Sequence, residues 1–219
     1  AIRLCLVGSE MCIRDRLGWN PGDDREVLSL EEMVDEFRFE RVSKSGAVFD
    51  REKLNWMNQQ YLLKLPEEEY FRMIDHVIQK GDYHDQDPGK IRQAAEILKT
   101  RLVTLSDLNQ KLGLFFEENP EIKDLQAIEV LKEENSKTVL KEFLQQAENL
   151  DQLTSENLGQ LVKSVQKSTG IKGRGLWMPL RCAITREVSG PELPAMLDFF
   201  GGEKCLHLIR QTLENPSLN

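Results

Sequence analysis

The sequence lacks most of the features that identify an enzyme active site or a membrane protein. Its longest uncharged apolar runs are only a few residues, far short of the ~20 residues that a membrane-spanning helix needs. It contains 3 scattered histidines and no P-loop, no nucleophile elbow and no zinc-ligand spacing. Acidic residues outnumber basic ones, 37 to 29, so a chain-wide basic surface for nucleic acid is absent and any such surface must be a local patch. We therefore assign no catalytic residue and no metal ligand, and we expect neither a DNA partner nor a membrane.

Cysteine is also scarce, with 4 in 219 residues. Residues 1–16 differ in character from the rest of the chain, and Cys5–Arg16 (CLVGSEMCIRDR) looks like a translated sequencing adapter. We interpret residues 1–16 as non-native, which leaves Cys182 and Cys205 as isolated thiols without C-x-x-C spacing. We expect both to be buried as small hydrophobic residues. This cysteine usage is consistent with a reducing compartment.

The pattern of apolar residues from Leu17 onward predicts a mainly α protein, with a small mixed piece near the start. The hydrophobic content of 40% is enough for a packed core, and the length suits one large domain or two small ones. Ser29 and Glu32 form a capping box, and Gly170 stands where a helix should end. Phe39–Asp50 indicates a loop or a small hairpin. The predicted helices cover about 29–37, 53–65, 67–79, 88–102, 105–112, 136–150, 155–170, 191–201 and 203–213.

Positive charge is concentrated in one segment, residues 163–190. The segment carries a net charge of +5 inside a chain of −8, so the remainder carries −13. Glycines are interleaved with these basic residues, and they allow a phosphate backbone to approach closely, while Trp177 could stack on a base. A solvated basic loop is the alternative interpretation. The acidic remainder favours recognition of one folded RNA at a few points.

Three long stretches resemble bacterial-type glutamyl-tRNA synthetases. LGWNPGDDREVLSLEEM (Leu17–Met33) and ERVSKSGAVFDREKLNWMNQQYL (Glu40–Leu62) are similar to the region that comes after the catalytic core of that family. GLWMPLRCAITREVSGPELPAMLDFFG (Gly175–Gly201) is similar to the C-terminal anticodon-binding region. The resemblance extends over Leu17–Asn219 and covers only about the C-terminal half of the family's length.

The resemblance implies a fragment that selects tRNA and performs no chemistry. The family activates glutamate with ATP and Mg²⁺ in an N-terminal Rossmann-type catalytic domain, which we expect to be missing, and this part needs no cofactor. By analogy, residues 17–65 would be a stem-contact remnant, and 66–150 and 151–219 would be two small helical anticodon-binding subdomains. The implied partner is tRNA(Glu). We expect a monomer, located in the cytoplasm or in an organelle.

Single residues carry over from the family only where its motifs match. Arg101, in KTRLVTL, corresponds to an arginine that reads the cytosine at the third anticodon position and so excludes tRNA(Gln). Arg181, in MPLRCAIT, corresponds to an arginine that contacts the anticodon, and Leu193 to a residue that packs on its first base. Gly190 stands where some members have a hydroxyl-bearing residue. The implied anticodon-binding set is completed by Pro191, Trp177 and Met178.

Two other interpretations remain open. The charge of −13 outside the basic segment also suits a stand-alone helical module that binds protein and not RNA. A glutaminyl-tRNA synthetase is a weaker alternative, because that family reads its anticodon with β-barrels and the periodicity here is helical. Binding of tRNA that weakens steeply with salt would identify the RNA-binding alternative.

Overall fold

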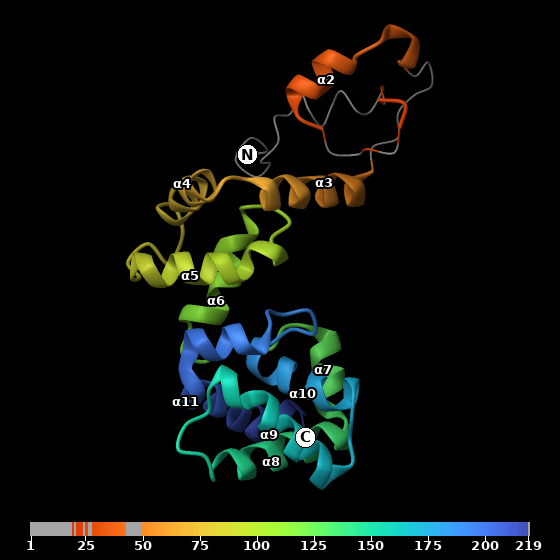
Figure 1. Ribbon diagram of the computed structural model, residues 1–219. Helices are drawn as coiled ribbons and strands as arrows, with labels where there is room; N and C mark the ends of the chain where they lie inside the picture. Colours follow the sequence, from red (N-terminus) through yellow and green to blue (C-terminus); the bar gives the residue numbers. More distant parts are fainter. Residues whose placement is uncertain (1–18, 20, 24, 26–27, 43–49, 219) are drawn as a thin grey trace. The chain divides into compact units, whose positions relative to one another are not determined.

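A computed structural model describes residues 19, 21–23, 25, 28–42 and 50–218 (Figure 1). The segment interpreted as non-native, 1–16, lies outside the described residues, as does most of the predicted hairpin. The chain forms two compact units, Ala1–Leu112 and Gly113–Asn219, and the division falls inside helix α6 (Asp107–Phe116). The subdomain boundaries implied by the resemblance, after residues 65 and 150, stay a prediction.

The first unit begins with the short helix α2 (Leu30–Glu36). Its capping box forms as predicted: the Glu32 amide donates to Ser29 Oγ at 3.1 Å, and the Ser29 amide donates to Glu32 Oε2 at 2.6 Å. A 3₁₀ turn, η3 (Phe39–Arg41), comes next. The β pairing of the described residues is limited to an isolated bridge between Trp19 and Val42.

The first unit continues with α3 (Arg51–Lys64), α4 (Glu67–Ile78), α5 (Pro88–Leu98) and the 3₁₀ turn η4 (Lys99–Arg101), and ends within α6. Capping residues fix the starts of α3 and α5. The Asp50 carboxylate caps α3 by accepting from the amides of Glu52 and Lys53, and Asp87 caps α5 with Pro88 in its first turn. The mainly α class is confirmed by these helices.

The second unit is a bundle of α7 (Leu125–Lys132), α8 (Glu134–Ala147), α9 (Ser155–Thr169), α10 (Arg174–Thr185) and α11 (Leu193–Glu214), closed by η5 (Pro216–Leu218) (Figure 1). Helix α10 packs against α7, α8 and α11, and α9 packs against α8 and α11. Gly170 ends α9 in the left-handed conformation, φ 72°, as predicted. Gly201, φ 77°, kinks α11, so the two predicted helices are joined there into one.

Helices α7 and α10 were not predicted from the pattern. Helix α10 contains Pro179, which cannot donate to the carbonyl one turn earlier and costs ~3 kcal/mol or more inside a helix. It forms because its buried face is extensive: Leu176, Leu180, Cys182, Ala183 and Ile184 are all at most 1% exposed. The tertiary packing of this face outweighs the local penalty.

None of the helices in the described part of the chain combines the length and apolar character needed to cross a bilayer.

Candidate nucleic-acid interface

In the first unit, the segment around Arg101 is held in place by helix α3. Arg101 ends η4 and is half-buried, directly before the fully buried Leu102. The Gln59 side-chain amide donates to the Thr100 carbonyl at 2.9 Å. The Asn58 amide donates to a second carbonyl of the same segment, that of Val103. The backbone on both sides of Arg101 is therefore fixed by two neighbouring side chains of one helix.

Asn58 and Gln59 were missed as candidate residues. Asn58 is 0% exposed and lies one turn after Leu54 and one turn before Tyr61, which belong to the predicted apolar side of that helix. A polar residue among apolar positions is buried only if it is hydrogen-bonded. The place of Asn58 on the apolar side of the helix was the signal available in the sequence. Its hydrogen bond to the Val103 carbonyl identifies Asn58 as a residue that positions the Arg101 segment.

In the second unit, three predicted residues lie on helix α10. Trp177 and Arg181 are four residues apart and Met178 and Arg181 three apart, which places them on one side of the helix. Trp177 is 43% exposed, and Met178 and Arg181 are half-buried. The Arg181 Nη2 forms an ion pair with Glu192 Oε2 at 2.8 Å. Since Glu192 directly precedes α11, this pair joins Arg181 to the turn that contains the other predicted residues.

That turn, residues 186–192, contacts Thr185 at the end of α10. The Thr185 hydroxyl lies 2.9 Å from the carbonyl oxygens of both Arg181 and Glu187, and donates to one of them at a time. Gly190 packs directly on Thr185, because a Cβ on Gly190 would come within 2.1 Å of Thr185 Oγ1. Thr185 therefore occupies the space that a hydroxyl-bearing side chain at position 190 would need.

The remaining predicted residues are buried. Gly190 and Pro191 are enclosed, and Leu193, the first residue of α11, is 3% exposed. Glu192 directly precedes that helix, and its side chain makes no capping hydrogen bond to it. A base contact at Leu193 stays a prediction. In the structure these three residues support the turn, whereas Trp177 is the most exposed member of the set.

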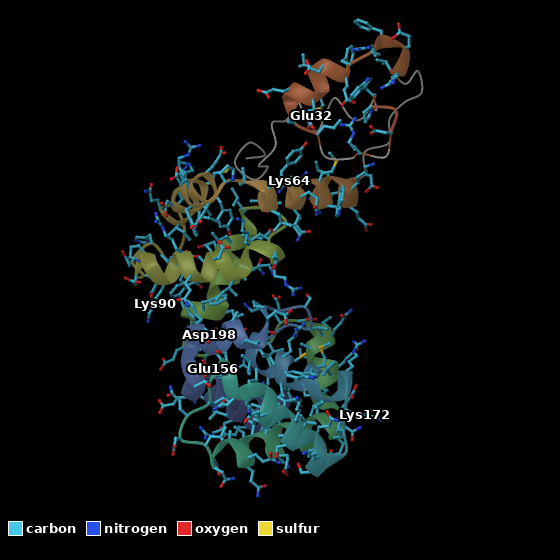
Figure 2. The ribbon with its side chains drawn as sticks, in the orientation of Figure 1. Glu32, Lys64, Lys90, Glu156, Lys172 and Asp198 are labelled. Carbon is cyan, nitrogen blue, oxygen red and sulfur yellow. The ribbon has the colours of Figure 1, made fainter. Side chains whose placement is uncertain are left out.

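The basic segment, residues 163–190, is mostly helical, with turns at 170–173 and after 185. Its exposed members Lys163 and Lys167 lie on α9, Lys172 lies in the turn after α9 (Figure 2), and Arg174 begins α10. Arg181 is ion-paired, and a sixth basic residue, Arg186, is buried. The positive surface in this region is therefore supplied by the end of α9 and the start of α10.

The described residues contain no group of three or more His, Cys, Asp and Glu side chains arranged to hold a metal ion. A hollow of about 960 Å³ on the first unit is lined mainly by α4, together with Arg92 and Leu105. None of the predicted anticodon-binding residues lines it. The candidate nucleic-acid interface therefore consists of the Arg101 segment in the first unit and the face around Arg181 in the second.

The described residues form mainly helical units, with Arg101 on η4 and Arg181 on α10. Residues 57–213 match the family described as the anticodon binding domain. The match includes both Arg101 and Arg181 and extends over more than half of the chain. The chain belongs to this family.

Individual relatives are glutamate–tRNA ligases. The chain is 34% identical over 203 residues to that of Geobacillus stearothermophilus, covering 90% of this chain and 41% of the relative. It is 33% identical over 199 residues to that of Finegoldia magna, covering 90% and 40%. The chain thus spans about 40% of the length of these relatives.

The fold is shared with solved structures of the same kind of enzyme. A glutamate tRNA ligase from Elizabethkingia meningosepticum, crystallised in complex with its amino acid, superimposes with a TM-score of 0.67 at 26% identity. The superposition covers 94% of this chain and 40% of that structure. A glutamate-tRNA synthetase from Elizabethkingia anophelis gives a TM-score of 0.63 over the same shares.

Proposed function

We propose that this chain is the anticodon-recognising part of a glutamate–tRNA ligase and that its ligand is tRNA(Glu). The observation that carries the proposal is the family match over residues 57–213, which includes Arg101 and Arg181. Unpaired anticodon bases can be splayed out, stacked on side chains and read on their Watson–Crick edges. A half-buried arginine on a fixed backbone suits the reading of an edge, and an exposed tryptophan suits stacking.

Arg101 reads the third anticodon base, cytosine, and thereby excludes tRNA(Gln). A guanidinium offers only donors, which match the carbonyl edge of cytosine. The clamp from Asn58 and Gln59 supports this role, since base reading requires a side chain held in one place. Arg181 contacts the other anticodon bases from α10, with Trp177 and Met178 beside it. Gly190, Pro191 and Leu193 form the wall at the start of α11.

The parent protein joins glutamate to its tRNA in an ATP- and Mg²⁺-dependent reaction. In this proposal the present chain supplies only the selection of the tRNA. We expect the purified chain to form no glutamyl-adenylate, and pyrophosphate exchange dependent on glutamate would contradict that expectation.

The test is binding of a fluorescent tRNA(Glu) anticodon stem-loop, measured by anisotropy at several salt concentrations. Arg101→Gln and Arg181→Gln should each weaken binding, and Arg101→Gln should also reduce discrimination against the tRNA(Gln) stem-loop by about 1–3 kcal/mol. The matched controls are the exposed arginines Arg72→Gln in the first unit and Arg210→Gln in the second. We expect the controls to shift affinity less than about twofold, since neither lies among the anticodon-binding residues.

Affinity should fall linearly with salt on a log–log plot. A chain that binds neither stem-loop would refute the proposal and favour the protein-interaction module suggested by the charge of −13 outside the basic segment. Unchanged discrimination in Arg101→Gln would refute the role of that residue alone.

A further inference from the structure

Arg186 combines two unfavourable features at one position. It comes directly after the last residue of α10 with φ 63°, the only positive φ of a non-glycine residue in the described chain. Its side chain is nevertheless folded inward, and the residue is 5% exposed. A left-handed residue commonly ends a helix, but it is usually glycine, so the side chain of Arg186 adds strain that glycine would avoid.

Within the described residues, the hydrogen-bond partners of the buried guanidinium are neutral. Nη1 donates to Thr212 Oγ1 at 2.7 Å and Nη2 to Gln211 Oε1 at 2.5 Å. Nε is buried without a hydrogen-bond partner. A guanidinium has five N–H donors, so most of them lack a protein acceptor in the described part of the chain.

The charge of Arg186 is also unbalanced. Burial lowers the pKa of Arg186 to about 10, which leaves the side chain protonated at neutral pH. Buried charges in proteins are normally paired with an opposite charge. No carboxylate of the described residues forms an ion pair with Arg186, so a protein counter-ion is missing within that part of the chain.

Arg186 lines a cavity of about 450 Å³ in the second unit. Its walls are the loop 119–122, the end of α11 and the residues 215–217 that come after it. Most of the polar lining is neutral: Asn119 accepts from Gln211 Nε2 at 3.0 Å, and Asn215 and Ser217 also face the cavity. Its volume lies within the range of about 300–1,000 Å³ that is usual for small-ligand sites, and most of its lining residues are polar.

Two carboxylates also line the cavity, those of Glu121 and Glu214. They would repel a polyanion, but salt screens charges that are in contact with solvent. The lining therefore suits a small oxyanion that reaches the guanidinium, and it disfavours a long stretch of nucleic acid in the cavity.

We propose that this cavity binds a single phosphate group, with the guanidinium of Arg186 as its positive charge and donor. Nε is too deeply buried to reach a ligand, but an oxyanion would accept from the N–H groups of Nη1 and Nη2 that Thr212 and Gln211 leave unused, and would balance the charge. The phosphate group can come from two sources, free inorganic phosphate or one backbone phosphate of a bound RNA. The site itself does not depend on the function proposed above.

The first experiment titrates the whole chain with inorganic phosphate at constant ionic strength, adjusted with sodium chloride, and measures binding by calorimetry. The variant is Arg186→Gly, because glycine adopts φ 63° without strain. Loss of a hydrogen bond to a charged group should weaken phosphate binding about tenfold or more. Arg210→Gln, an exposed arginine on the same helix as Thr212, is the control and should bind phosphate like the parent chain.

Arg186→Lys serves as a second variant, because it keeps the charge and loses the planar set of donors. Circular dichroism and a urea transition for each variant establish that it is folded. A parent chain that binds no phosphate overturns the proposal, as does equal binding by folded Arg186→Gly. Weakened binding in both variants with an unchanged control supports it.

A second experiment separates the two sources. Phosphate is added to the complex with the anticodon stem-loop, again at constant ionic strength. If an RNA phosphate occupies the cavity, phosphate competes with the stem-loop in the parent chain but not in Arg186→Gly. If there is no competition and phosphate still binds through Arg186, free phosphate is the ligand. Failure of the stem-loop to bind at all would refute the proposed function and leave the phosphate titration standing.

Discussion

Replacing Gly190 by alanine should destabilise the second unit substantially. The added Cβ would lie 2.1 Å from Thr185 Oγ1 and 2.4 Å from Thr185 Cβ, against an ordinary contact distance of 3.4 Å or more. Thr185 has little room to move away, because it is 1% exposed and its hydroxyl is bonded within the end of α10. Overpacking of this kind costs about 1–3 kcal/mol. We expect a loss near the upper end of that range, since both the hydroxyl and the β-carbon are in the way.

The free energy of unfolding is obtained from urea transitions measured by circular dichroism and extrapolated linearly. Gly159→Ala is the matched control: Gly159 is exposed on α9 with no atom within 4 Å of its added Cβ. It should stabilise the chain by about 0.5–1 kcal/mol, because alanine favours a helix interior.

The double variant with Thr185→Gly tests the contact itself. Thr185→Gly removes both atoms that obstruct the new methyl group, so the double variant should be more stable than the sum of the single changes by at least ~1 kcal/mol. A Gly190→Ala chain within about 0.5 kcal/mol of the parent would refute the reasoning, because that is the range of substitutions without a packing cost. Strict additivity in the double variant would show that the cost has another origin.

Three other substitutions or reactions test the two arginine sites and the core. Glu192→Gln should raise the affinity for the anticodon stem-loop several-fold at low salt, because it releases Arg181 from its ion pair and removes a negative charge. An unchanged affinity in the anisotropy titration would show that Arg181 does not contact the RNA. Asn58→Ala should lower the free energy of unfolding by about 1–3 kcal/mol, because it leaves the Val103 carbonyl without its donor. It should also weaken binding of the stem-loop, as Arg101→Gln does. Burial raises the thiol pKa of Cys182 to about 11 and that of Cys205 to about 12. Alkylation of both thiols at mildly alkaline pH, measured by peptide mass spectrometry, should therefore be slow in the native chain and fast in urea. Rapid alkylation of the native chain would contradict their burial.

The parts of the fold that were predicted correctly are those with signals inside one helical turn. The capping box of Ser29 and Glu32 and the helix end at Gly170 act on amides and carbonyls only a few residues away. Such contacts form in the same way whatever surrounds them. The interpretation as a member of a tRNA-binding family rested on motifs, and the match over residues 57–213 confirmed it.

Helix α10 could not be predicted in this way, because Pro179 argues locally against a helix. Its apolar face becomes decisive only when α7, α8 and α11 are present to cover it. The segment was therefore interpreted from its charge, and four of its six basic residues are indeed exposed.

The sequence by itself determined the helical class, several helix ends, the family and which arginines deserve a test. The tertiary structure decided how the arginines are held. The backbone beside Arg101 is held by side-chain amides from α3, Arg181 is paired with Glu192, and Arg186, which was not among the candidates, is turned inward to Thr212, 26 residues away. The reason is physical. Capping and helix propensity depend on neighbours in the chain, whereas burial and pairing of a charge depend on groups that only folding brings together.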